Sequence, residues 1–456
     1  MKNNIKTKLK FIVALMFVMI MILSCVEEVA VPVVTDFNAE IENNDYSVPV
    51  HVRITNITEG ADTYNWSFPG GIPEVSSDRN PGTIIYSQPG NYTIRLEASN
   101  RDGSIDVKEK EISIYDAVQT SFTAEYIINN FPPMEVVLTN STTGADSYQW
   151  LFEEGMPLSS TQQHPNNVVF NTPGDHIITL EVSNGIETFQ SQQTVTVAPH
   201  LETNFSYNVN LEDNDFEAPV TLTMVNTCIS ATDYIWTFTG GTPSSSTEEN
   251  PTVTYSTPGT YTINLEATNG KETQMISQTV TVLPNTNLRT FTDIEIGINT
   301  AHISNTKAAF FSTTMQRTYT NSEVDNSNGS EIDIAFYGLN QNFTYNKFVS
   351  PNQVQDYTFD AIPGANHTKF INSIETCNCS ASMTVSEFDS MTDDTILDAL
   401  TIEETIGGLQ DFDNTIEPRI ILFETPDERK GAIKIKDFVE DGQNSYVIVD
   451  IKVQKQ

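Results

Sequence analysis

Basic residues are scarce in this sequence of 456 residues, with 23 Lys and Arg against 60 Asp and Glu, and the formal net charge is −37. Because such a polyanion repels phosphate backbones, we exclude nucleic acid as a partner. Charged residues make up only 18% of the chain, so most of its surface must be neutral and polar. Tyr, Phe and Ile are too frequent for a disordered acidic chain. This composition is typical of an extracellular β-protein, and the length suggests roughly three or four domains.

The hydrophobic run at the N-terminus is short. The apolar segment Phe11 to Leu23 falls below the roughly 20 residues that a membrane-spanning helix needs. It follows the basic segment Met1 to Lys10, and this order predicts a signal peptide over residues 1–24.

The end of this signal resembles a lipoprotein processing site. Ile22-Leu23-Ser24-Cys25 is similar to the lipobox of bacterial lipoproteins, and Glu27-Glu28 resembles a surface-export signal of Bacteroidota-type lipoproteins. The resemblance implies that Cys25 is the acylated first residue of the mature chain and that residues 25–33 form a tether. It also implies an outer-membrane lipoprotein that is exposed at the cell surface and held in the membrane by two acyl chains. The alternative is an ordinary signal peptide with a chance Cys.

Cysteine is rare as well, and only Cys228, Cys377 and Cys379 remain beside Cys25. We expect Cys377 and Cys379 to be too close in sequence for easy mutual pairing. A disulfide from Cys228 to either of them would cross a domain boundary. No second Cys pair and no His pair lies at zinc-ligand spacing from these cysteines, so we interpret all three as small structural side chains.

The three Trp residues reveal an internal repeat. Trp66, Trp150 and Trp236 are spaced by 84 and 86 residues, and each opens a Trp-x-Phe sequence. Nearly the same period relates three further sets of residues, namely Phe37, Phe122 and Phe205; Asn56, Asn140 and Asn226; and the Pro-Gly turns at Pro89, Pro173 and Pro258. Four markers with one period predict three homologous modules. We place module one at residues 34–116, module two at 119–198 and module three at 201–283.

Apolar residues alternate with polar ones inside each module. In the segment Tyr92 to Ala98, the residues Tyr92, Ile94, Leu96 and Ala98 share one face, which predicts a half-buried antiparallel strand. Short strands separated by Gly, Pro and Asn turns predict a β-sandwich of about 80 residues. Trp and Phe of each Trp-x-Phe then face the core between the sheets, and we favour core packing over sugar stacking for the three Trp.

At these residues the modules resemble PKD domains, an immunoglobulin-like sandwich family of surface proteins. The resemblance rests on Trp66-Ser67-Phe68-Pro69-Gly70-Gly71-Ile72-Pro73 and Trp236-Thr237-Phe238-Thr239-Gly240-Gly241-Thr242-Pro243, and on the Pro-Gly-x-Tyr closing strands. Module two departs from the pattern, with Glu153-Glu154-Gly155-Met156-Pro157 in the turn and His176 in place of the Tyr. PKD-like modules serve as spacers, adhesive units and occasional binding units, so the resemblance implies a fold more than a function.

Residues 288–456 break the repeat and predict one β-rich α+β domain, called the C-terminal domain below. Gly431 to Lys436 and Tyr446 to Val453 alternate around Asp441-Gly442, which predicts a β-hairpin. The segment Ser386 to Thr401 predicts a helix with Ser386 as its N-cap, and a second short helix is expected over Ile402 to Leu409. The predicted fold class is therefore mostly β, with tandem immunoglobulin-like sandwiches before this domain.

No catalytic motif is present, so we predict a protein that is not an enzyme. His302 and His367 have no Cys or carboxylate at ligand spacing, and we interpret them as core or surface residues. Glu403, Glu404, Asp411 and Asp413 define no particular catalytic pair in so acidic a chain. No cofactor is expected. Calcium at Glu248-Glu249 or at Glu212-Asp213-Asn214-Asp215 is an alternative to a solvated acidic face.

Tyr337, Tyr345 and Tyr357 are the candidate ligand-binding residues. They lie among Asn, Gln and Asp, a neighbourhood that suits sugars, although packing within loops is the favoured explanation. We therefore interpret the chain as a lipid-anchored envelope protein whose modules form a stalk for a C-terminal binding domain, with a polysaccharide as the proposed partner. The alternatives are an adhesin that binds surface proteins through its modules and a hydrolase with an unrecognised C-terminal site.

Overall fold

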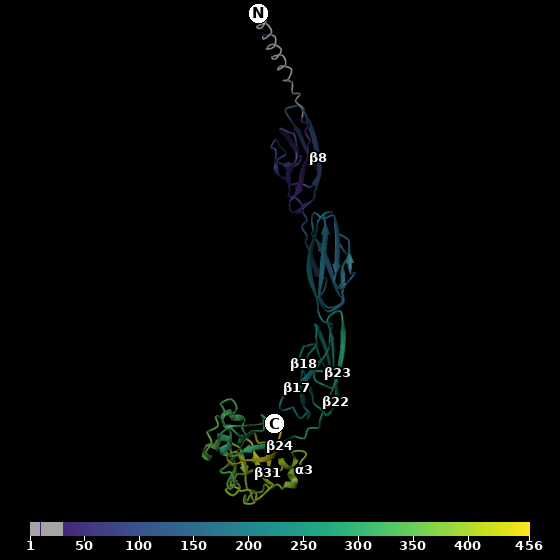
Figure 1. Ribbon diagram of the computed structural model, residues 1–456. Helices are drawn as coiled ribbons and strands as arrows, with labels where there is room; N and C mark the ends of the chain where they lie inside the picture. The colour runs from purple at the N-terminus through teal and green to yellow at the C-terminus, as the bar shows by residue number, and fades with distance from the viewer. Residues whose placement is uncertain (1–9, 11–30) are drawn as a thin grey trace. The chain divides into compact units, whose positions relative to one another are not determined.

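The computed structural model describes residue 10 and residues 31–456. The predicted signal peptide and Cys25 therefore lie outside the described residues, apart from Lys10. The chain divides into two compact units, Met1–His200 and Leu201–Gln456 (Figure 1). Module one and module two belong to the first unit, and module three and the C-terminal domain belong to the second.

Each module consists of two antiparallel sheets. In module one the sheets have the orders β1-β2-β6-β4 and β5-β3-β7-β8, in module two β12-β14-β10-β9 and β13-β11-β15-β16, and in module three β17-β18-β21 and β20-β19-β22-β23. The strands of module one are β1 (Phe37–Ile41), β2 (Val50–Asn56), β3 (Thr63–Ser67), β4 (Gly71–Ile72), β5 (Val75–Ser76), β6 (Gly82–Tyr86), β7 (Gly90–Ser99) and β8 (Ile105–Ile114), with the 3-10 turn η1 (Glu42–Asn44). Those of module two are β9 (Phe122–Tyr126), β10 (Met134–Asn140), β11 (Ser147–Phe152), β12 (Gly155–Met156), β13 (Ser159–Ser160), β14 (Val168–Phe170), β15 (Gly174–Ser183) and β16 (Thr188–Val197). Those of module three are β17 (Phe205–Val209), β18 (Val220–Asn226), β19 (Asp233–Phe238), β20 (Ser245–Ser246), β21 (Thr252–Tyr255), β22 (Gly259–Thr268) and β23 (Thr273–Val282).

The three Trp residues fill the module cores. Trp66, Trp150 and Trp236 are fully buried, and each packs against a Phe of the first strand with ring centroids 5.0 to 5.1 Å apart. Each indole N–H donates to a backbone oxygen twelve residues further on, at 2.9 Å. Because a buried indole N–H needs such a partner, the repeated bond explains why the Trp is retained at one position. The prediction of tandem immunoglobulin-like sandwiches is confirmed.

Module two keeps this architecture although its sequence departs from the other two. Tyr92 and Tyr261 donate their hydroxyls to the backbone oxygen four residues earlier, at 2.9 and 2.7 Å. In module two, Nε2 of His176 lies 2.8 Å from the oxygen of Thr172. An imidazole therefore replaces a phenol in the same turn contact.

The C-terminal domain also contains two antiparallel sheets, of five and four strands. Their orders are β24-β32-β31-β30-β29 and β26-β25-β27-β28. The strands are β24 (Leu288–Gly297), β25 (Phe310–Ser312), β26 (Arg317–Tyr319), β27 (Ile334–Gly338), β28 (Asn346–Val349), β29 (Lys369–Ile371), β30 (Arg419–Glu424), β31 (Lys430–Val439) and β32 (Tyr446–Gln454). The helical elements are α2 (Asn299–Ile303), α3 (Val385–Ser390), α4 (Thr395–Asp398), η2 (Asn321–Glu323), η3 (Gly329–Glu331), η4 (Pro351–Tyr357) and η5 (Gly442–Asn444). The hairpin β31–β32 agrees with the predicted turn at Asp441-Gly442.

The helix expected over Ser386 to Thr401 is wrong in its start and its length. Thr384 is the N-cap of α3 and forms a capping box with Glu387, and the helix ends at Ser390. Met391 adopts an extended conformation with a ψ of 117°, which ends α3. The Asp393 carboxylate accepts from the backbone N–H of Thr395, the first residue of the separate helix α4. The helix expected over Ile402 to Leu409 is absent from the described chain, because the hydroxyl of Thr405 holds a turn by accepting from Gly408 N–H.

The expectation for the C-terminal cysteines is also wrong, because Cys377 and Cys379 form a disulfide. Their Cα atoms lie 5.2 Å apart, within the usual range for a disulfide. Asn378 between them adopts a φ of +50°, and this left-handed conformation brings the two side chains to the same side. Cys228 is free. No helix among the described residues has both the length and the apolar character of a membrane span.

Candidate functional site

Two of the three candidate tyrosines pack against each other. Tyr337 on β27 and Tyr357 at the end of η4 have ring centroids 5.3 Å apart. Lys347 on β28 pairs with Tyr337 across the strands, and its ammonium lies 5.5 Å from the centroid of Tyr357 and 3.9 Å from Asp411. Burial, followed by the charge of Asp411, raises the pKa of Tyr337. Both rings are half-buried, so much of their surface is used within the fold.

Tyr345 is the candidate with an open ring. Tyr345 directly precedes β28 and is 55% exposed. Its carbonyl oxygen accepts from Leu339 N–H at 3.0 Å, which closes the turn between β27 and β28. Exposed Gln341 and Asn342 lie in this turn. An exposed ring beside amides can stack on a sugar while the amides bind its hydroxyls.

The histidines of the C-terminal domain occupy different environments. His302 is fully buried, accepts from Ala309 N–H at 3.0 Å through Nδ1, and contacts the rings of Phe310 and Phe359. Burial lowers the pKa of His302 to about 4, although the charge of Asp360 opposes this shift. Among the described residues, Nε2 of His302 has no hydrogen-bond partner. His302 is therefore a neutral core residue.

His367 has the carboxylate partner that the sequence did not reveal. Its Nε2 lies 3.1 Å from Glu404, and its Nδ1 lies 3.1 Å from Oγ of Ser350. Ser, His and Glu are the residue types of a hydrolase triad. However, Ser350 is only 3% exposed, and its hydroxyl accepts from Thr368 N–H at 2.9 Å and lies 2.8 Å from Asn352. The Ser350 hydroxyl is thus buried and bonded within the fold, which closes it to a substrate.

The loop between the first two strands of a module contacts the domain that follows in the sequence. In module one, Ser47 donates its hydroxyl to Glu187 of module two at 2.6 Å and accepts from Asn184 at 3.0 Å. The equivalent loop of module three, residues 210–219, contacts the C-terminal domain instead. We call this segment the junction loop. It occupies the same place in the module but contacts a different kind of domain.

Arg289 at the start of β24 binds the junction loop. Its guanidinium donates to the backbone oxygens of Leu211 and Glu212 at 3.0 and 2.5 Å and to the side chain of Asn214 at 2.6 Å. It also pairs with Asp215 at 3.2 Å. The Arg289 side chain is 12% exposed, so these bonds are largely shielded from water.

Lys455, directly after β32, binds the same loop from the other end of the domain. Its ammonium pairs with Asp215 at 2.6 Å and with Glu217 at 2.7 Å. Glu217 also accepts from the backbone N–H and the hydroxyl of Thr286 in the connecting segment. Of the acids proposed for calcium, Asp215 is thus neutralised by protein cations, and Asp213 accepts from Thr221 N–H at 3.1 Å.

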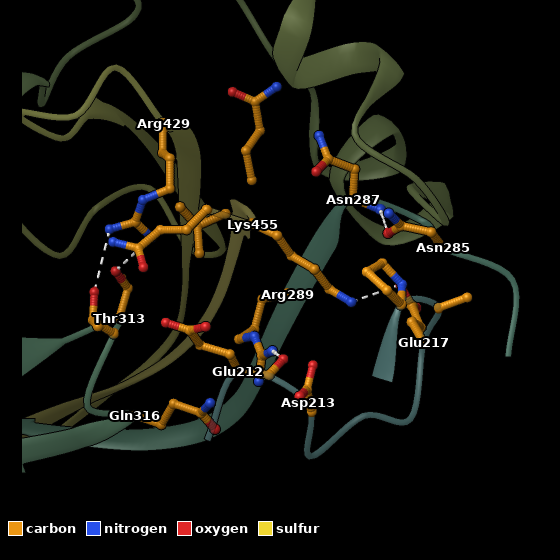
Figure 2. Close-up of a pocket in the computed structure, with 16 residues that line it drawn as sticks. Glu212, Asp213, Glu217, Asn285, Asn287, Arg289, Thr313, Gln316, Arg429 and Lys455 are labelled. Atoms are coloured by element: carbon orange, nitrogen blue, oxygen red, sulfur yellow. Dashed lines mark hydrogen bonds and ion pairs between the residues drawn. The ribbon is translucent and has the colours of Figure 1, made fainter. Parts of the chain in front are cut away.

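A pocket of about 210 Å³ lies between the junction loop and the C-terminal domain (Figure 2). Its charged lining residues are Glu212, Asp213, Glu217, Arg289, Arg429 and Lys455. An adjoining pocket of about 490 Å³ shares Glu217, Arg289 and Gln316 with it. Sequence reasoning missed these cations, because the contacts join residues as far apart as Glu217 and Lys455. The scarcity of Lys and Arg in the sequence was the one feature that could have drawn attention to these cations.

Comparison with known proteins identifies the repeats. The family model described as PKD domain matches residues 41–109, 131–197 and 206–282. No curated protein matches the chain. Similar solved structures include Sidekick-1 immunoglobulin domains 1-5, at 9% identity and a TM-score of 0.27, covering 57% of this chain and 60% of that one. The chain thus spans less than two thirds of that structure.

Two further similar structures have comparable scores. Chicken CNTN1 FN1-FN3 domains match at 11% identity and a TM-score of 0.19, covering 55% of this chain and 97% of that one. A tetra-tandem repeat in the extending region of a large adhesion protein matches at 10% identity and a TM-score of 0.22, covering 93% of this chain and all of that one. At these scores we infer nothing about function from the three structures. The three family matches coincide with the three sandwiches, and the chain is therefore a PKD-domain-containing protein.

Proposed function

We propose that this chain is a lipid-anchored protein of the bacterial cell surface, in which three PKD domains act as a stalk and the C-terminal domain captures glycans. The observation that carries this proposal is the junction, where Arg289 and Lys455 bind one loop of module three. A flexible linker lets a domain rotate freely, whereas paired and largely buried contacts fix its orientation. A fixed terminal domain suits presentation of a binding face.

The proposed anchor is Cys25, and its support is the resemblance of Ile22-Leu23-Ser24-Cys25 to a lipobox. Metabolic labelling with an alkyne fatty acid tests it directly. The unaltered chain and the Cys228→Ser control should carry the label, and Cys25→Ser should lose it and leave the membrane fraction. Equal labelling of Cys25→Ser would rule out this anchor.

The proposed glycan capture is supported by the exposed Tyr345 and its amide neighbours, and by the polar junction pocket. A glycan array probed with the full chain tests it. We expect the array to retain the chain on at least one polysaccharide class. The substitution Tyr345→Ala, or Arg429→Gln in the junction pocket, should abolish this retention. Retention of none would refute glycan capture.

A second candidate function is adhesion through the modules. Its support is a group of exposed apolar residues on module two, where Met156 and Leu158 are 67% and 68% exposed and Leu151 is 51% exposed. Exposed apolar patches on a soluble domain often mark interaction sites. If residues 31–284 alone adhere to cells and the double substitution Met156→Asp and Leu158→Asp abolishes adhesion, the modules are adhesive units. A pure stalk should not adhere.

A further inference from the structure

The junction pocket holds one cation with unused hydrogen-bond donors. Arg429 lies directly before β31, and its side chain is 9% exposed. Its Nε binds Asp427 at 2.7 Å, its Nη1 donates to Thr313 at 3.0 Å, and its Nη2 reaches Thr314 at 3.5 Å. A guanidinium has five N–H donors, and these contacts use three of them, one weakly. No described residue takes the other two.

A buried network holds this guanidinium in place. The hydroxyl of Thr313 accepts from Arg429 and donates to Asp333 at 2.5 Å, and Thr313 N–H donates to the same carboxylate oxygen at 2.8 Å. Asp333, Thr313 and Arg429 are all buried, so the hydrogen bonds that link them hold the guanidinium in one orientation. A guanidinium that is already oriented loses little entropy on binding, and its planar fork matches a carboxylate.

The other two cations of the pocket are held by carboxylates of the junction loop, whereas Arg429 pairs with Asp427 outside this loop, through Nε alone. Arg289 and Lys455 are held by Asp215, and Lys455 also by Glu217. They therefore offer little additional attraction to an anion. Arg429, together with the hydroxyl of Thr314, is the position in the pocket where a single negative group fits best.

The junction loop supplies the opposite kind of group. The carboxylate of Glu212 makes no hydrogen bond or ion pair with the part of the chain that the structure describes. In Figure 2 its side chain extends from the junction loop toward the side of the pocket that carries Thr313 and Arg429. A carboxylate there accepts hydrogen bonds from a ligand and repels a second negative charge, so phosphate dianions and sulfated polyanions fit poorly.

We propose that the junction pocket binds a hydroxylated monocarboxylate the size of one sugar-acid residue, a hexuronate. Its carboxylate lies on Arg429 and Thr314, and its hydroxyls donate to Glu212. An ammonium in place of the hydroxyls would pair with Glu212 but would also be repelled by Arg289 and Lys455, so an amino acid is the competing ligand that the titration below includes. Pockets at domain interfaces are frequent ligand sites, and this inference rests on the proposed glycan capture because it names the sugar class.

Calorimetric titration of the full chain with D-galacturonate, D-galactose, glycine and acetate tests the proposal. Galacturonate should bind, and galactose, which lacks the carboxylate, should bind at least about tenfold more weakly. Binding of glycine at equal or greater affinity would overturn the proposal in favour of an amino acid. Equal affinities for galacturonate and galactose would also overturn it.

Variants separate the pocket from the rest of the fold. Arg429→Gln should reduce galacturonate affinity about tenfold or more. Because this change can also disturb the Asp333 network, Glu212→Gln serves as a second variant on the exposed side of the pocket. It should weaken galacturonate binding several-fold and strengthen acetate binding, since a repelling charge is lost and a hydroxyl acceptor weakened. The matched control Glu249→Gln changes the same charge elsewhere in module three and should alter neither affinity.

An unchanged galacturonate affinity in both Arg429→Gln and Glu212→Gln would contradict the proposed site. If the full chain is retained on a glycan array but does not bind galacturonate, the hexuronate proposal fails while glycan capture stands. If the array retains nothing and galacturonate does not bind, both fail.

Discussion

The Nζ atom of Lys455 lies 2.6 Å from Oδ2 of Asp215, so the residue after the last strand of the chain is fastened to the junction loop of module three. Asp215 also pairs with Arg289 from the first strand of the C-terminal domain. The two ends of that domain thus meet on one carboxylate. Loss of this carboxylate leaves two largely buried cations without their shared partner, which is costlier than loss of a surface ion pair.

We expect Asp215→Ala to loosen the junction and to destabilise the C-terminal domain by about 1–3 kcal/mol. Hydrogen exchange of peptides from residues 284–291 and 446–456 measures the effect, and both segments should exchange faster. Glu249→Ala in the same module is the control and should leave them unchanged. Unaltered exchange in Asp215→Ala would show that the pairing contributes little.

The hydroxyls of Tyr86 and Tyr255 are buried without a hydrogen-bond partner among the described residues. Burial raises the pKa of each to about 12, and module two has Phe170 at the equivalent place. We expect Tyr86→Phe and Tyr255→Phe to stabilise their modules by about 1 kcal/mol, because an unsatisfied polar group is removed. Denaturant unfolding followed by Trp fluorescence measures this, since all three Trp lie in the modules. A lower unfolding midpoint would indicate that each hydroxyl has an ordered water partner.

Cys228 occupies a position that holds Thr in the other modules. Thr58 and Thr142 donate their hydroxyls to backbone oxygens at 3.1 and 3.3 Å, and the thiol of Cys228 reaches Asn204 oxygen at 3.5 Å. We expect Cys228→Thr to preserve or raise the stability of module three by about 0.5–1 kcal/mol. Cys228→Val has the same shape without the donor and should be less stable than Cys228→Thr. Equal unfolding midpoints for the two variants would mean that the hydrogen bond contributes nothing.

His302 should make the C-terminal domain sensitive to acid. Its pKa is about 4 in the folded domain and near 6.5 in an unfolded chain, so the unfolded state binds more protons between these values. The stability contribution is complete above pH 6.5 and falls as the pH drops toward 4, by about 3 kcal/mol in total. Hydrogen exchange measures the free energy of unfolding of the C-terminal domain at pH 7 and at pH 4.5. The difference between the two values should be smaller in His302→Gln than in the unaltered chain. An equal difference would assign the acid sensitivity to other groups.

The sandwiches were predictable from the sequence because their determinants are local and repeated. Trp66 and Phe68 lie two residues apart on one strand, and the same pattern returns in the other modules at a nearly constant period. The alternation of polar and apolar residues then assigns the buried face without knowledge of distant contacts.

The junction could not be predicted, because it depends on long-range partners. Nothing in the sequence near Asp215 points to Lys455, and the same separation conceals the contact between His367 and Glu404. The helix after Thr384 was overestimated because apolar periodicity continues past Ser390, while the backbone becomes extended at Met391. The Cys377–Cys379 disulfide depends on the backbone conformation of Asn378, which composition does not reveal.

The most direct test compares two forms of the chain on one glycan array, residues 31–456 and residues 31–284. The second form keeps the three PKD domains and lacks the C-terminal domain. If the PKD domains are a stalk and the C-terminal domain captures glycans, the longer form is retained and the shorter form is not. Equal retention of the two forms, or retention of neither, would contradict this account.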